Sequence, residues 1–398
     1  MSSRSDDADA VADVGLLSPV AAGTAGERLT SDRAVVDAML RFESALLHVL
    51  VQHGIAPAAA SAVADAIAAT DVDPRALALA APVGGAPVLP LVERLRANAP
   101  DGMAPWIHFG ATTQDAVDTA LMLVAQDVLR QIEADLGRLA ATLAERVRAS
   151  RDVPLVARTL TQHAMPTTLG MRIAGWLAGV LDAVDAIRDA PTPPVSLGGP
   201  VGTAAAYGAQ APDVVGALAT ALDLAVPELS WHTRRTPIAT IVQSVLATGA
   251  ACGTIAADVL LMAQSEIGEV REAEGGPSLA MSHKANPTQS VLIASAAREL
   301  PPLASIVQAS AVAESERPAG AWHAEWQPLR WLLRLGSATA ERAATMAPGL
   351  RFDHAAMARN LDALVAAVDA DEAWVATQVE PTGMWIDRVL ARHAAMYP

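Results

Sequence analysis

The stretch GGPSLAMSHKANP, residues 275–287, interrupts two long helical runs. Its Gly, Pro and Ser residues cannot continue the preceding helix, so the stretch is predicted to be a loop. It carries a hydroxyl at Ser278, an ammonium at Lys284 and an amide at Asn286, which favours a site over a plain helix cap. Pro287 would open the next helix, whose first N–H groups present a positive dipole end. The loop therefore predicts a site for an anionic ligand.

The composition favours long packed helices over sheets. The 398 residues are 52% hydrophobic but only 3% aromatic, and alanine and leucine dominate, as is typical of closely packed helices. The formal net charge of −15 argues against non-specific nucleic-acid binding, so no nucleic-acid partner is expected. The single cysteine, Cys252, excludes an internal disulfide framework and CxxC metal sites. It lies in an apolar helical run and is expected to be an inert core residue.

Two segments bear on where the protein resides. Residues 1–14 are acidic and rich in Ser and Ala, without a basic and apolar leader, so we expect a disordered tail on a cytoplasmic protein. Residues 238–263 form the most apolar run. That run contains Gln243 and Asp258, and small residues such as Gly249 allow close helix contact. A buried bundle helix is therefore favoured over a membrane span, and no membrane partner is expected.

The hydrophobic pattern predicts an all-α protein built on a bundle of long helices. Apolar residues repeat every three or four positions over residues 34–53, 115–149, 167–190, 237–274 and 287–313. Apolar faces remain around several of these helices, which predicts that bundles from more than one chain associate. We expect an N-terminal helical domain at 15–106, the central long-helix bundle at 107–345 and a short C-terminal helical domain at 346–398.

The segment IHFGATTQD, residues 107–115, places two hydroxyls immediately before a long amphipathic helix. Thr112 and Asp115 fit an N-cap and an acidic first turn, which is the plain structural interpretation. The alternative is that the hydroxyls of Thr112 and Thr113, together with the helix start, hold a carboxylate. Both interpretations remain open on the residues alone.

Four further segments carry side chains of the kind found in sites. They are RTLTQHAMPTT at 158–168, SLGGPVGT at 196–203, WHTRR at 231–235 and ERPAGAWHAEW at 316–326. The glycine-rich segment lacks the GK[ST] ending of a P-loop and no strand is expected before it, so nucleotide binding is disfavoured. The HxE pair of the last segment would suit a zinc deaminase only with a distal CxxC, which one cysteine cannot supply.

The pattern SxxMxxKxNP at 278–287 resembles the signature loop of the fumarase/aspartase superfamily, usually GSSxMPxKxNP. Three positions depart from it: Pro277 replaces Gly, Leu279 replaces the second Ser and Ser282 replaces Pro. Other segments resemble the superfamily's HxGATSxD, RTHxQxAxPxT and GGxxGT motifs, and the likeness covers about residues 15–398. It implies a three-domain all-α fold with a central long-helix bundle, assembled as a homotetramer, here with a trimmed C-terminal domain.

The resemblance also implies roles for individual residues. Ser278 would be the catalytic base, and His163 could supply a second catalytic imidazole. The substrate-binding residues would be His108, Thr112, Thr113, Gln114, Gln162, Arg235, Lys284, Asn286 and Arg317. For His163 a packing role is an equal alternative, and for Arg235 a plain surface position. The ligand would be a small polycarboxylate, and this chemistry requires no metal and no organic cofactor.

Three features resemble the muconate cycloisomerases within that superfamily. Leu160 occupies a position where fumarases and argininosuccinate or adenylosuccinate lyases have histidine, and WHTRR and ERPAGAWHAEW match that branch. The implied function is lactonisation of 3-carboxy-cis,cis-muconate to 4-carboxymuconolactone, in protocatechuate degradation, at active sites shared between subunits. Two alternatives stay open. One is a β-elimination lyase that releases fumarate from a substituted succinate of the argininosuccinate, aspartate or nitrosuccinate type. The other is a non-catalytic helical assembly protein.

Overall fold

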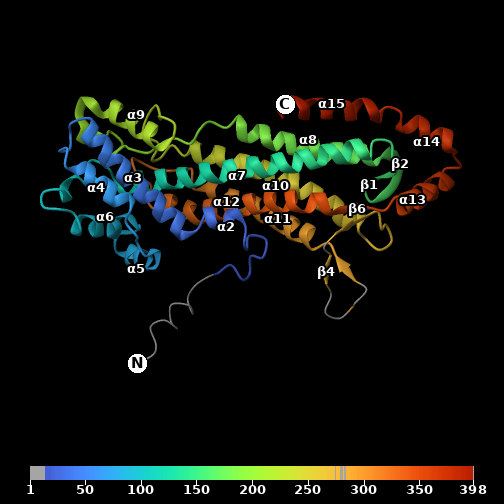
Figure 1. Ribbon diagram of the computed structural model, residues 1–398, viewed down its shortest axis with the longest axis horizontal. Coiled ribbons are helices and arrows are strands. Elements are labelled where there is room, and N and C mark those ends of the chain that lie inside the picture. The colour runs from blue at the N-terminus through green and yellow to red at the C-terminus, as the bar shows by residue number, and fades with distance from the viewer. Residues whose placement is uncertain (1–13, 274, 278–280, 282–283, 398) are drawn as a thin grey trace.

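Long helices packed side by side form the body of the molecule (Figure 1). The structure is a computed structural model and describes residues 14–273, 275–277, 281 and 284–397. The bundle consists of α7 (Thr113–Ala149), α8 (Leu169–Arg188), α10 (Thr236–Met262), α11 (Thr288–Ala309) and α12 (Ala321–Met346). Of the predicted N-terminal tail, residues 1–13 lie outside the described residues.

Helix α7 sets the length of the bundle. It begins at a capping box in which Thr112 and Asp115 satisfy each other's backbone N–H groups. Its apolar positions, such as Leu136 and Leu143, are buried against the neighbouring helices. At 1.5 Å per residue, its 37 residues span about 55 Å. The segments before and after α7 therefore lie at opposite ends of the bundle.

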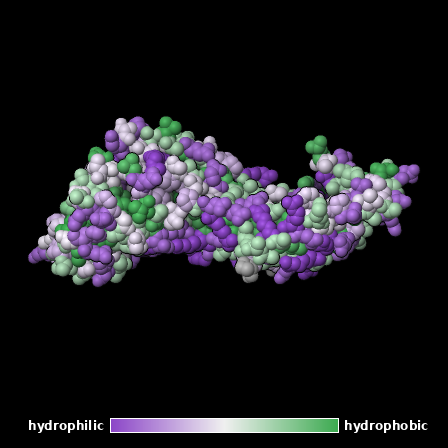
Figure 2. All heavy atoms as spheres, turned by 90° about the horizontal axis from the view of Figure 1, so that it is seen from above, coloured by the Kyte–Doolittle hydropathy of each residue, from purple (hydrophilic) through white to green (hydrophobic). Residues whose placement is uncertain are grey.

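Further helices cover the end of the bundle where α7 begins. They are α3 (Asp32–Gln52), α4 (Ala60–Ala68), α5 (Pro74–Gly84), α6 (Val88–Ala97), η1 (Ala104–Trp106), η2 (Ala205–Gln210) and α9 (Ala211–Leu222). The short helix α2 (Ala25–Leu29) instead packs along α12, where the Ala25 N–H donates to Glu341 at 2.8 Å. Helix α3 packs against both α7 and α9. Figure 2 shows this end as the broader part of an elongated molecule, with hydrophilic side chains spread along its length.

The opposite end carries the described strands. The hairpin of β1 (Pro154–Thr159) and β2 (Gln162–Thr168) is antiparallel. The other pairs are β3 (Val270–Glu272) with β6 (Leu350–Phe352), and β4 (Gly276–Pro277) with β5 (Ala285–Asn286). The remaining elements here are η3 (Ala347–Gly349), α13 (His354–Ala367), α14 (Glu372–Val379) and α15 (Thr382–Met396), and α15 runs back over α8.

The single helix predicted over residues 237–274 is wrong beyond Met262. The C-cap is Ala263, and Gly268 then has a φ of +67°, a left-handed conformation that does not belong to an α-helix. The next residue, Glu269, is fully buried and accepts two hydrogen bonds from the Arg158 guanidinium at 2.8 and 2.9 Å. This buried ion pair, formed with a residue on β1, fixes the chain direction after α10.

The prediction of a mostly helical fold is confirmed, with the hairpin as its main exception. Because residues 162–168 pair with β1, the helix predicted to start at 167 begins at Leu169. The core prediction for Cys252 is also confirmed, since its side chain is fully buried. Burial raises the pKa of the Cys252 thiol to about 12, so it stays neutral and inert.

Gly336 on α12 lies close to α10. A Cβ at this position would overlap Cγ1 of Val245 in the bundle interior. We expect Gly336→Ala to destabilise the protein by about 1–3 kcal/mol, because a side chain or a helix must shift. Gly216→Ala on α9 is the control, since no atom lies within 4 Å of its added Cβ and alanine favours a helix. Equal losses of melting temperature in the two variants would contradict the close contact.

Candidate active site

The Asp115 carboxylate organises the start of α7. It is fully buried and accepts hydrogen bonds from the backbone N–H of Thr112 at 3.0 Å, of Gly198 at 2.8 Å and of Gly199 at 2.9 Å. The His232 Nε2 atom lies 2.7 Å from it. Burial alone would raise the pKa of Asp115, but the His232 hydrogen bond and charge, with the backbone N–H groups, lower it below its usual value. The predicted N-cap is therefore real, and it also holds the glycine-rich loop.

His108 lies beside this cap with a φ of +59°, a left-handed conformation that is unusual for histidine. Its Nδ1 lies 2.6 Å from Oε1 of Glu43 on α3, and the Glu43 side chain is only 1% exposed. Burial lowers the pKa of His108, but the charge and hydrogen bond of Glu43 outweigh it and the net shift is upward. The sequence interpretation did not single out Glu43, although a carboxylate between Met39 and Leu46 on an apolar helix face was a signal for it.

Two predicted substrate contacts, Gln114 and Arg235, are instead core residues. The Gln114 Nε2 atom donates to the His232 carbonyl at 2.8 Å. The guanidinium of Arg235 is paired with Asp118 at 2.7 and 3.0 Å and with Glu325. Burial would lower the pKa of Arg235, but these two carboxylates raise it. Both side chains are committed to the bundle interior, so neither is available to a substrate, and Arg235 is not a surface arginine.

Thr113 and Arg317 lie at the same end of the bundle as His108. Thr113 is the first residue of α7 and is partly exposed. Arg317 is partly exposed and donates to the Pro200 carbonyl at 3.2 Å, which places it beside the glycine-rich loop. The structure therefore brings together four predicted residues here: His108, Thr112, Thr113 and Arg317.

Gln162 and His163 lie at the other end of α7, on the exposed face of the hairpin. The turn before them contains Leu160 and Thr161, with φ values of +48° and +68°. The Leu160 side chain is 95% exposed. Within one chain these residues are about 55 Å, the length of α7, from Thr112.

The signature loop also lies at this far end. Lys284 is exposed, and the Asn286 Nδ2 atom donates to the Gly276 carbonyl at 3.2 Å, across the β4–β5 pair. The predicted base, Ser278, falls outside the described residues. Glu272 joins the two sides of the loop, because its carboxylate accepts from the backbone N–H of Gln289 at 3.0 Å and of Ser290 at 2.8 Å. This carboxylate caps the start of α11 and fixes where the loop returns.

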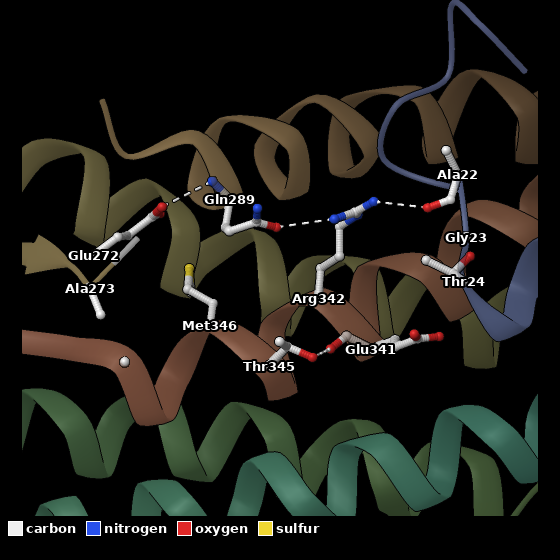
Figure 3. A pocket seen from close by; sticks show the side chains of 11 residues that line it. Ala22, Gly23, Thr24, Glu272, Ala273, Gln289, Glu341, Arg342, Thr345 and Met346 are labelled. Carbon is white, nitrogen blue, oxygen red and sulfur yellow. Dashed lines mark hydrogen bonds between the residues drawn. The ribbon is translucent and has the colours of Figure 1, made fainter. Parts of the chain in front are cut away.

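A cavity of about 390 Å³ opens beside the loop (Figure 3). The end of α12, the start of α11 and the segment 22–24 form its walls. Arg342 reaches across it and donates to the Gln289 side chain at 3.1 Å and the Ala22 carbonyl at 3.3 Å. Among the described residues, no group of three or more His, Cys, Asp or Glu side chains is placed to hold a metal ion.

Both the sequence and the long-helix fold match known proteins. A family profile described as Lyase matches residues 27–301, and the chain belongs to that family, within the fumarase/aspartase superfamily. The predicted resemblance is confirmed.

Its relatives include enzymes with two kinds of name. "Nitrosuccinate lyase" of Streptomyces davaonensis is 43% identical over 369 residues, which cover 89% of this chain and 78% of the relative. "3-carboxy-cis,cis-muconate cycloisomerase" of Pseudomonas putida is 38% identical over 341 residues, covering 83% and 81%. Among solved structures, the 3-carboxy-cis,cis-muconate lactonizing enzyme of Pseudomonas putida has a TM-score of 0.88 at 31% identity, covering 96% of this chain and all of that one. A fumarate lyase from Mesorhizobium sp. BNC1 has a TM-score of 0.82 at 26% identity, covering 92% and 97%.

We expect Asp115→Asn to lower the melting temperature and to weaken its dependence on acid pH. The lowered pKa of Asp115 means that its contribution to stability is complete above its usual value of 3.8 and is lost as pH falls through the lowered value. Asparagine cannot accept all the donors that surround the carboxylate, so a loss of about 2–4 kcal/mol is expected at neutral pH.

The measurement is the melting temperature between pH 3 and 7. Asp387→Asn is the control, because Asp387 forms an exposed ion pair with Arg151 and should change the neutral-pH value little. An Asp115→Asn protein as stable as the parent at pH 7 would contradict the proposed role of the carboxylate.

Proposed function

We propose that this enzyme lactonises 3-carboxy-cis,cis-muconate to 4-carboxymuconolactone, as part of protocatechuate degradation. One substrate carboxylate adds across a double bond, the electron pair moves onto a neighbouring carboxylate as an aci-carboxylate, and the carbanion carbon takes up a proton. The relatives named as cycloisomerases and the 0.88 TM-score to a lactonizing enzyme support this reaction class. Relatives of this kind also support a cytoplasmic enzyme.

Leu160 is the observation that carries the proposal. Eliminations that expel an amine or hydroxide need a proton donor beside the leaving group, because these groups leave as strong bases. A carboxylate leaves as a stable anion and needs none, and lactonisation is the reverse of such an elimination. The exposed leucine at the hairpin tip cannot donate a proton. It therefore favours a carboxylate as the entering or leaving group.

The remaining roles are inferred from where charge develops. Lys284, Asn286 and the hydroxyls at the start of α7 would stabilise the aci-carboxylate, since fixed donors act most strongly where negative charge appears. Ser278 would exchange the proton with the substrate carbon. The positive charge and hydrogen-bond donors around it would lower the pKa of its hydroxyl enough for the alkoxide to form. Gln162 and Arg317 would bind the remaining substrate carboxylates, and His163 stays a candidate for a second catalytic imidazole.

These residues can act together only if several chains contribute to one site. Within a chain, α7 separates Thr113 from the hairpin by about 55 Å. Helices α10 and α11 are long and apolar enough to cross a membrane by length and composition, yet only 50% and 39% of their apolar windows are buried within the chain. We infer that other copies cover these faces, in a homotetramer with shared active sites, rather than a membrane.

A second candidate is β-elimination of nitrite from nitrosuccinate, with fumarate as product. The 43% identity to a nitrosuccinate lyase favours it specifically. Nitrite, like a carboxylate, leaves as a stable anion, so Leu160 is compatible with this reaction too. Argininosuccinate or aspartate would expel a basic nitrogen, and the same residue disfavours them.

The two candidates are separated by direct assay. We expect the ultraviolet absorbance of 3-carboxymuconate to fall on addition of enzyme, at a kcat/KM at least about tenfold above that for nitrosuccinate, measured as fumarate and nitrite. The reverse ratio would establish the second candidate. Turnover of argininosuccinate or aspartate alone would contradict the argument from Leu160, and absence of turnover on every substrate would remove the proposal altogether.

Shared active sites predict complementation between inactive chains. Ser278→Ala and Thr113→Val should each lose most activity, because each removes a hydroxyl that every site needs. Ser282→Ala should stay active, as the control for a hydroxyl in the same loop. Mixed assemblies of the two inactive chains should regain activity, because some sites draw both segments from intact chains.

The control mixture combines Ser278→Ala with Lys284→Met. Both lesions lie in the same loop, so every site contains one of them and no activity should return. Recovery in this control, or its absence in the first mixture when the chains have co-assembled, would contradict sites built from separate chains.

A further inference from the structure

Glu43 is a buried carboxylate with a single described partner. It lies on α3 between Phe42 and Leu46, both of which are at most 1% exposed. One oxygen, Oε1, lies 2.6 Å from His108 Nδ1. The other, Oε2, is buried and has no hydrogen-bond partner within the described part of the chain. A carboxylate in such surroundings needs a positive neighbour, because an uncompensated buried charge is costly.

Only one nitrogen of the His108 ring forms a hydrogen bond with the described part of the protein. Its Nδ1 is held by Glu43, while Nε2 has no partner among the residues that the structure describes. The ring is 12% exposed, so it borders solvent rather than the core. The left-handed backbone of His108 is a strained conformation that persists only where the surroundings enforce it. With Nδ1 engaged by Glu43, Nε2 is the ring nitrogen left for a ligand, four residues before the Thr112 cap.

Other charged and titratable groups around the ring come from three further elements. Asp115 at the start of α7 favours the protonated ring, whereas Arg96 on α6 opposes it. The Arg96 guanidinium is itself engaged by the Ile107 carbonyl at 2.8 Å. Tyr207 on η2 donates to the Phe109 carbonyl at 2.8 Å, and burial raises the pKa of its phenol, so it contributes no charge. Glu43 is thus the carboxylate in contact with the ring.

We propose that Glu43 is a positioning residue that keeps His108 protonated and its ring fixed, so that Nε2–H donates to a carboxylate of the substrate. The proposal rests on the proposed function in one respect, that the ligand is a small polycarboxylate. The charged pair is neutral overall before the ligand arrives. A substrate carboxylate at Nε2 would therefore accept a charge-assisted hydrogen bond. The free-energy cost of removing the charged ring from water is already offset in the folded protein by Glu43. Binding becomes coupled to the protonation of this ring.

The pKa shift of His108 sets the sign of the pH effect. Because this pKa is raised, the ring is fully protonated, and so able to donate from Nε2, below the usual pKa of 6.5. The protonated form is lost as pH rises through the raised pKa. KM should therefore increase with pH across that interval. In Glu43→Gln, burial would lower the pKa of His108 without the opposing effect of the carboxylate. The increase in KM should therefore occur at lower pH.

The test monitors the His108 ring by NMR of protein with 15N-labelled imidazoles, in the parent and in Glu43→Gln. Glutamine keeps the size of the side chain and removes its charge. We expect the His108 titration midpoint to fall, and the KM for 3-carboxymuconate at pH 7.5 to rise by at least about tenfold with little change in kcat. Tricarballylate, an inert tricarboxylate, should shift the His108 Nε2 signal in the parent.

Asp65→Asn is the matched control. Asp65 lies 3.0 Å from His48, which like Glu43 belongs to α3, but that pair is largely exposed. Its loss should change neither the His108 midpoint nor the KM. A purely structural role for Glu43 would lower the melting temperature without moving the midpoint, and that result overturns the proposal.

The two proposals fail in different ways. An unchanged His108 midpoint in Glu43→Gln, or no response of Nε2 to tricarballylate, rejects the role of Glu43 whatever the enzyme converts. A protein without turnover whose His108 midpoint still depends on Glu43, and whose Nε2 still responds to tricarballylate, rejects only the proposed reaction. The KM of the His108→Gln variant is then compared with that of the His108→Gln, Glu43→Gln double variant. An equal rise in both shows that Glu43 acts through the ring as proposed.

Discussion

The buried Asp115 carboxylate is the interaction on which the end of the bundle around His108 depends. It joins three segments that are distant in sequence: the cap of α7, the backbone of the glycine-rich loop and His232. Each contributes a donor, and an ionised carboxylate in the interior is tolerated only when such donors surround it. Gly198 and Gly199 allow the loop backbone to approach closely enough to supply two of them. The hydroxyls at the cap are held in place by this same cluster.

The second constraint is the length of α7. It holds one set of candidate residues, around His108, at the broad end and another set, around the signature loop, at the strand-bearing end. Under the proposed function, each set is half of an active site that a single chain does not complete. The half-sites differ in chemistry. The first is preorganised by buried carboxylates and hydrogen bonds, whereas the second is exposed, and Glu272 fixes only its base.

The long helices and the family resemblance could be predicted from the sequence because they rest on local signals. Helical periodicity is repeated many times along α7, and the loop motif lies within ten residues. The role of Arg235 could not be predicted, because its partners Asp118 and Glu325 are 117 and 90 residues away. The hairpin was missed since the left-handed φ of Leu160 and Thr161 has no signature in residues of those types. Glu43 was missed because its partner becomes apparent only when α3 packs beside His108.

The length of α7 has a consequence for how such a protein can change over evolution. Each residue added to a helix advances the chain by 1.5 Å and rotates the succeeding residues by about 100° around the helix axis. A single insertion in α7 would therefore turn the hairpin away from its position and, in the proposed homotetramer, displace it relative to the neighbouring copies. Point substitutions on the helix surface leave that spacing intact. If the proposed shared sites are correct, divergence is expected in side chains and loops, with the number of residues in the central helices held constant.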